Sequence, residues 1–146
     1  PASGKIYVFG TEVNRMSPNR RVKLGLARTF QINSLFLNMT VAENVGLAVS
    51  AAAGLDAKPW GRLQFQSEIL DRISELLTKV RLLDVAHSRI RDLAYGYRRL
   101  VEIALALALN PKILMLDEPA AGVPARDTEL ILQILKELPP DLAVLL

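Results

Sequence analysis

The sequence predicts an α/β fold in which a parallel-sheet core is interrupted by a helical insert. Residues 113–116 form a short, wholly apolar run directly after a helix, a pattern typical of a strand buried on both faces of a parallel sheet. A helical pattern at 124–138 is followed by a second apolar run at 142–146, which predicts a further buried strand. Residues 35–92, in contrast, contain helical patterns joined by an apolar loop at 35–39 and a connector at 54–61.

Composition limits the class of protein. The chain has 146 residues, of which 51% are hydrophobic and 23% charged, as in a folded globular domain. Because it contains no cysteine, it has neither a disulfide framework nor a thiolate metal site. The net charge of +3 is not gathered into long blocks, so nucleic-acid binding is not indicated. No uncharged apolar run approaches the roughly 18 residues of a membrane span.

The N-terminal elements are short. Residues 5–9 alternate polar and apolar side chains before Gly10, which predicts an antiparallel strand at a sheet edge. Ser17 and Pro18 begin a helical turn that reaches Leu24. Residues 27–32 then form another strand.

Two helices dominate the predicted insert. Thr40 and Glu43 have the spacing of a capping box, so a helix begins at Val41 and runs to about Ala53. A long amphipathic helix follows from Arg62. The apolar residues of its buried face are Phe65, Ile69, Ile73, Leu76, Leu77 and Val80. A short helical piece is predicted at 82–86.

A glycine-containing loop precedes the next helix. Gly96 allows the backbone to approach a ligand closely, and the helix that begins at about Tyr97 offers free N–H groups and a dipole that favour an anion. Arg98 and Arg99 add positive charge to the first turn. The alternative is a helix that begins at a glycine and carries solvated arginines.

Two adjacent carboxylates, Asp117 and Glu118, end the apolar run at 113–116 and are followed by Pro119 and Gly122. Ligands of open parallel sheets bind beyond the carboxyl ends of the strands, which is where these acids lie. Mg²⁺ takes one or two carboxylates together with phosphate oxygens, so the pair suggests a magnesium–nucleotide site. The alternative is a strand that simply ends in solvent.

Together these segments resemble an ATP-binding cassette (ABC) ATPase. Residues 93–97, Leu-Ala-Tyr-Gly-Tyr, are similar to the signature loop, residues 113–118 to the Walker B strand, and residues 119–123 to the D-loop. The Ala-Tyr-Gly variant, followed by Arg-Arg-Leu-Val-Glu-Ile-Ala at 98–104, is most similar to the ATPase subunits of branched-chain amino acid importers.

The resemblance implies ATP as the nucleotide, Mg²⁺ as the metal, and a role for each site residue. Asp117 is expected to hold Mg²⁺ and Glu118 to act as the general base or to orient water. Gln31, in Arg-Thr-Phe-Gln, matches the Q-loop glutamine that contacts Mg²⁺ and the attacking water, although a lone glutamine after a strand is ordinarily a surface residue. The residues expected to bind the γ-phosphate of an opposite subunit are Tyr95, Gly96, Tyr97 and Arg98.

The same resemblance predicts domains and partners. Residues 1–34 would be part of the core with the Q-loop, 35–92 the helical subdomain, and 93–146 the signature loop, Walker B and D-loop with the following helix and strand. A second ATPase subunit would dimerise across the signature loop, and transmembrane permease subunits would contact the helical subdomain and the Q-loop. No nucleic-acid partner is expected, and the location would be peripheral, at the cytoplasmic face of the membrane.

Some family features are missing or altered. No Gly-x-x-x-x-Gly-Lys-[Ser/Thr] motif occurs, and His87, the one histidine, lies too early to be the switch histidine and is expected at the surface. The sequence is therefore interpreted as an internal fragment that is inactive by itself. Tyr97, Leu105 and Pro124 stand where the family usually has glutamine, arginine, and aspartate or asparagine.

The function predicted is that of an ATP-binding subunit that couples ATP hydrolysis to import of branched-chain or other hydrophobic amino acids. Two alternatives remain. An ABC-type ATPase of DNA repair or chromosome maintenance shares the signature and Walker B, but it carries long coiled coils in place of the short insert at 35–92. A non-catalytic interaction module formed by the helical subdomain fits the absence of a P-loop.

Overall fold

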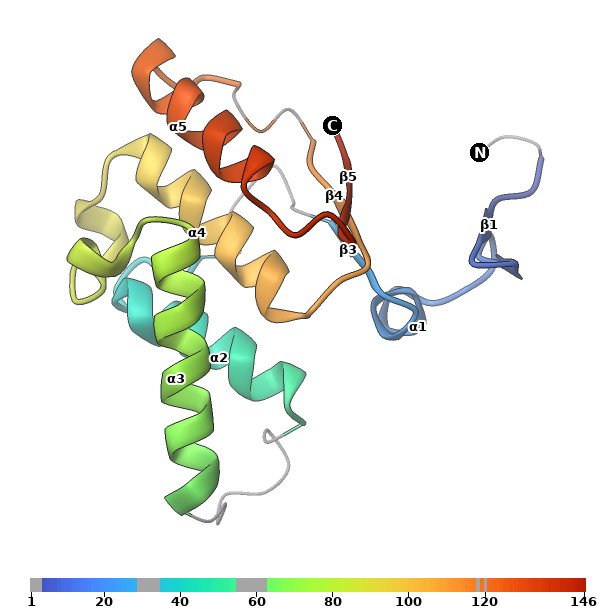
Figure 1. The fold of residues 1–146 in the computed structure, drawn as a ribbon, viewed down its shortest axis with the longest axis horizontal. Coiled ribbons are helices and arrows are strands. Elements are labelled where there is room, and N and C mark those ends of the chain that lie inside the picture. Colours follow the sequence, from blue (N-terminus) through green and yellow to red (C-terminus); the bar gives the residue numbers. More distant parts are fainter. Residues whose placement is uncertain (1–3, 29–34, 55–62, 118, 120) are drawn as a thin grey trace.

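A computed structural model describes residues 4–28, 35–54, 63–117, 119 and 121–146 (Figure 1). The predicted Gln31 and Glu118 lie outside the described residues. The chain forms a small parallel sheet, a group of helices beside it and an N-terminal hairpin. None of the described helices combines the length and the apolar character that crossing a membrane requires.

The sheet contains three parallel strands in the order β3-β4-β5, formed by Leu26–Arg28, Ile113–Met115 and Ala143–Leu145. The central strand, β4, has partners on both sides, and its Leu114 has no exposed surface. The predicted α/β class with a parallel sheet is confirmed, and β4 is the buried strand that the apolar run indicates.

The last strand differs from its prediction. In the described part of the chain β5 pairs with β4 alone, and its residues are exposed, half-buried and exposed in turn. Leu145 is 58% exposed. The prediction of a buried strand was wrong because an apolar run does not say how many neighbours the strand has.

Four longer helices make the rest of the core: α2 (Val41–Ala52), α3 (Leu63–Lys79), α4 (Tyr95–Ala108) and α5 (Ala125–Lys136). Two 3-10 turns, η2 (Leu83–Val85) and η3 (Ile90–Asp92), lie between α3 and α4. In Figure 1, α4 runs between α5 on one side and α2 with α3 on the other, and it contacts all three. Nine of its 14 residues are buried, so α4 is the centre of the helical packing.

The capping box that begins α2 is confirmed. The Thr40 side chain accepts a hydrogen bond from the Glu43 backbone N–H, and the Glu43 carboxylate accepts one from the Thr40 N–H at 2.7 Å. The helix α4, in contrast, begins at Tyr95, two residues before its predicted start. Ala94 is extended and its carbonyl already accepts from the Arg98 N–H, so Gly96 belongs to the first helical turn.

The N-terminal part is the hairpin of β1 (Tyr7–Val8) and β2 (Thr11–Glu12), followed by α1 (Pro18–Lys23). The antiparallel strand predicted at 5–9 is present but shorter, and its partner β2 was not predicted. Phe9 and Gly10, both with positive φ, make the turn. In Figure 1 this hairpin projects away from the helices, with α1 between it and the sheet.

Candidate functional site

Asp117 lies directly beyond the carboxyl end of β4, where the sequence predicts a ligand. Its Oδ2 accepts a hydrogen bond at 2.9 Å from Nη2 of Arg28, the last residue of the neighbouring strand β3. The two side chains are 44% and 55% exposed. An open hollow of about 250 Å³ lies beside them, lined also by Met115 and Leu145. This ion pair was not predicted, although parallel strands bring their carboxyl ends to the same edge of a sheet.

Of the two residues expected to contact magnesium, Asp117 and Gln31, only Asp117 lies in the described part of the chain. No group of three or more His, Cys, Asp or Glu side chains gathers there. One half-exposed carboxylate at the end of a strand suits Mg²⁺, which takes its remaining ligands from phosphate and water. Gln31 and Glu118 are outside the described residues. In the sequence, Gln31 stands three positions after Arg28 and Glu118 directly follows Asp117.

The first turn of α4 lies against the loop that connects β4 to α5. Tyr95 and Tyr97 are 51% and 37% exposed, whereas Gly96 is buried. A Cβ on Gly96 would lie 2.5 Å from Oδ2 and 2.8 Å from Cβ of Asp127, and a Cβ on Gly122 would lie 3.9 Å from the Tyr95 ring. The space that Gly96 leaves is therefore filled by a side chain of α5.

Arg98 holds the start of α4 to the segment before it. Its Nε donates to the Leu93 carbonyl at 3.0 Å, and its Nη2 donates to the Arg91 carbonyl at 2.8 Å. The guanidinium predicted to contact the nucleotide therefore already donates hydrogen bonds to two backbone carbonyls.

Arg99 is buried, with 5% of its surface exposed. It forms an ion pair with Glu102, one turn further along α4. Its Nη2 donates to the Asp117 carbonyl at 2.9 Å, and its Nε donates to the Pro119 carbonyl at 3.4 Å. The alternative of solvated arginines is wrong for Arg99, because this side chain is buried and forms an ion pair with Glu102. A glutamate at i+3 within an apolar helix was the signal in the sequence.

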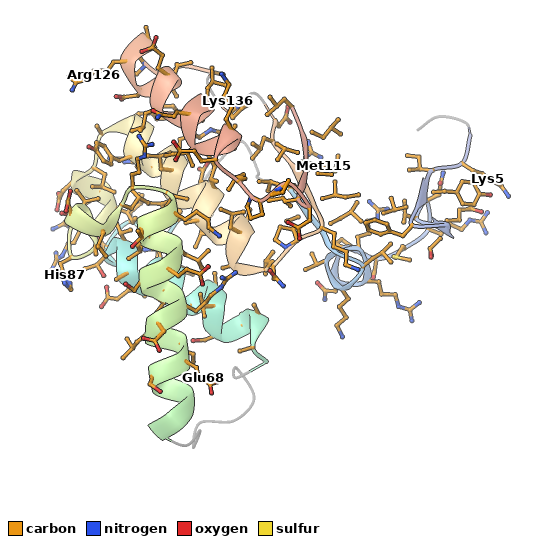
Figure 2. The ribbon with its side chains drawn as sticks, in the orientation of Figure 1. Lys5, Glu68, His87, Met115, Arg126 and Lys136 are labelled. Atoms are coloured by element: carbon orange, nitrogen blue, oxygen red, sulfur yellow. The ribbon has the colours of Figure 1, made fainter. Side chains whose placement is uncertain are left out.

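The structure thus links the two predicted motifs through other residues: Arg99 donates to the Asp117 carbonyl, Tyr95 lies near Gly122, and Gly96 lies against Asp127. His87 is exposed, as predicted, and lies among the helices far from Met115 of the sheet (Figure 2). Of the altered positions, Leu105 is half-buried against the hydrophobic core, and Pro124 occupies the N-cap position of α5 without a side-chain hydrogen bond.

Known proteins are similar to this chain in sequence. The family model described as ABC transporter matches residues 1–121. The branched-chain amino acid transport ATP-binding protein LivG of Escherichia coli K12 is 36% identical over 144 residues, which cover 94% of this chain and 56% of LivG. The corresponding protein BraF of Pseudomonas aeruginosa is 35% identical over 88% of this chain and 52% of BraF. The chain spans about half the length of these relatives.

Solved structures agree with the fold. A nucleotide-free ATP-binding cassette from an ABC transporter superimposes with a TM-score of 0.78 at 24% identity, covering 98% of this chain and 58% of that one. A dimeric cassette in a post-hydrolysis state, bound to ADP and phosphate, gives a TM-score of 0.75 at 26% identity, covering 99% of this chain and 62% of that one.

Proposed function

Because the chain belongs to the ATP-binding cassette family of ABC transporters, we propose that it carries the signature and Walker B portion of an ATPase subunit. The subunit couples ATP hydrolysis to import of branched-chain or other hydrophobic amino acids. The observation that carries the proposal is Asp117 at the end of β4 with the first turn of α4 against the same loop. The names of LivG and BraF support the choice of solute.

Each site residue has a role in this proposal. Asp117 would hold Mg²⁺, and Glu118 would orient or deprotonate the attacking water. Gln31 would contact the metal and that water through its amide. The metal would supply positive charge to the phosphate groups of the nucleotide. Arg28 pairs with the same carboxylate, since its Nη2 lies 2.9 Å from Oδ2 of Asp117.

Catalysis requires a second ATPase subunit. Tyr95, Gly96, Tyr97 and Arg98 form or flank the helix start that binds the γ-phosphate held by the opposite subunit. The exposed Tyr95 ring beside Gly122 supports an interface at this point of the loop after β4. The dimeric cassette among the similar structures supports the same assembly.

A second surface binds the transmembrane subunits and keeps the protein at the cytoplasmic face of the membrane. Phe36 and Leu37, which follow the Q-loop segment, are 58% and 49% exposed. Their loop is nevertheless anchored, because the buried Asn44 side chain accepts from the Phe36 N–H at 2.9 Å and donates to its carbonyl at 3.1 Å. A rigid loop that presents large apolar side chains is suited to docking. Cross-linking from Leu37 in the assembled transporter should reach a transmembrane subunit; absence of any such product would remove this surface from the interface.

ATP hydrolysis by a complete cassette subunit that contains residues 1–146 tests the enzymatic proposal. We expect magnesium-dependent hydrolysis that Asp117→Asn abolishes. Hydrolysis that is indifferent to this substitution would contradict the assigned role of Asp117.

A further inference from the structure

We propose that Arg99 is a positioning residue. Its guanidinium binds the backbone carbonyls of Asp117 and Pro119 and so holds the loop after β4 to α4. The inference rests on the proposed function for its effect on ATP hydrolysis. Its structural part, the control of the loop after β4 by one guanidinium, stands independently of that function.

The burial of Arg99 is the first step. A buried charge is costly unless it is paired and its hydrogen-bonding groups are satisfied. Glu102, whose side chain is 13% exposed, supplies the opposite charge. The two residues lie on the same helix, so their ion pair by itself connects α4 to nothing else. It serves to hold the guanidinium in one orientation.

The remaining edge of the guanidinium contacts the loop. Nε and Nη2 lie on one side of the planar group, and they donate to the carbonyls of Pro119 and Asp117. The Asp117 carbonyl belongs to the peptide that leads into Glu118, and the Pro119 carbonyl belongs to the peptide that leads into Ala120. Two donors from one rigid group thus constrain the path of the loop at two points.

Other contacts bring the first turn of α4 against the end of this loop and the start of α5. Asp127, in the first turn of α5, fills the space at Gly96, and Tyr95 lies near Gly122. The segment from Asp117 to Asp127 is therefore held to α4 at its beginning and at its end. Arg99 makes the contact nearest to the predicted catalytic carboxylates.

A lysine or an apolar side chain at position 99 changes this constraint in distinct ways. Lysine keeps the charge but replaces the planar fork with a single ammonium group. The pair R99M/E102L removes both charges, and exchange of a buried ion pair for apolar residues of similar volume is often neutral or stabilising. The double variant therefore removes the hydrogen bonds from Arg99 to the loop without leaving an unpaired charge in α4.

Amide hydrogen exchange of peptides covering residues 113–126, measured beside the melting temperature, tests the structural part in the 146-residue chain. We expect R99M/E102L to melt close to wild type while these peptides exchange about tenfold faster. Arg81→Met is the matched control, since Arg81 also joins two segments, through Gln133 of α5 and Glu137 directly after it, and should leave residues 113–126 unchanged. Wild-type exchange in R99M/E102L would overturn the proposal.

If R99M/E102L does not fold, R99K decides: faster exchange confined to residues 113–126 supports the proposal, and unchanged exchange overturns it. In the complete subunit, R99K should lower kcat by about tenfold or more with little change in KM for ATP, because the loop is misplaced and nucleotide contacts are not removed. An unchanged kcat would restrict Arg99 to a structural role. If the wild-type subunit does not hydrolyse ATP, the proposed function fails while the exchange result stands.

Discussion

Replacing Gly96 with alanine distinguishes two reasons for a glycine at the start of α4. If glycine is present only so that a ligand can approach the backbone, alanine should stabilise the chain without nucleotide. The reason is that alanine is favoured over glycine in helices by up to about 1 kcal/mol. If it makes room for α5, alanine should destabilise the chain. The two explanations therefore predict opposite signs.

The geometry at Asp127 gives the magnitude. The new methyl group would lie 2.8 Å from the Asp127 Cβ, which is fixed to the backbone of α5 and cannot rotate away. Overpacking of this kind costs about 1–3 kcal/mol, and a clash with a fixed atom belongs in the upper half of that range. After subtraction of the helix-propensity gain, we expect Gly96→Ala to reduce the free energy of unfolding by about 1–2 kcal/mol.

Thermal unfolding without nucleotide measures this effect. For a chain of this size, 1 kcal/mol corresponds to roughly 2–4 °C, so the melting temperature should fall by about 2–8 °C. The double variant Gly96→Ala with Asp127→Gly removes the clashing atoms and should lose less stability than the sum of the two single variants. A Gly96→Ala chain that melts at or above the wild-type temperature would refute the packing argument.

Three further predictions concern the site and the insert. In the complete subunit, Glu118→Gln should abolish turnover and leave ATP binding intact, as a turnover assay with a nucleotide-binding control will show. The melting temperature of the 146-residue chain should not change with millimolar Mg-ATP. A ligand that bound the folded chain at a hundred times its dissociation constant would raise the free energy of unfolding by roughly 2.7 kcal/mol. A rise in melting temperature that Asp117→Asn removes would contradict this prediction. Thr40→Ala should cost about 1 kcal/mol in denaturant unfolding by loss of the cap of α2.

The capping box also predicts a pH dependence. Hydrogen bonds from the Thr40 N–H and hydroxyl lower the pKa of Glu43 below its ordinary value. A depressed folded-state pKa means that the stabilisation is present above the unfolded-state pKa and is lost as the pH falls through the folded-state value. Glu43→Gln should therefore weaken the loss of stability in acid, and an unaltered acid limb of the pH–stability curve would contradict this.

Local signals in the sequence were sufficient for much of the fold. The capping box of Thr40 and Glu43 involves neighbours in the chain, and the apolar periodicity of α3 follows from one helix, so neither depends on distant contacts. The strand β4 was also predicted correctly, from a short apolar run that follows a helix and is closed by Pro119 and Gly122.

The remaining features depend on contacts between distant segments. Whether Arg99 is solvated or buried is decided by the loop after β4, and the pairing of Arg28 with Asp117 is decided by strand order. Gly96 was assigned to a loop because glycine is common there, yet its place in the helix follows from its fit against α5. Sequence patterns describe one element at a time, whereas these properties belong to pairs of elements.

The pairing of β3 with β4 has a consequence for the folding reaction. Leu26 and Ile113 are partners in the sheet although all of α2, α3 and α4 lie between them in the chain. Such a pairing closes a long loop, which is entropically costly, whereas the contacts among these three helices are closer in sequence. We therefore expect the helices to become protected first in a refolding experiment, with protection of the β4 amides in the slowest phase.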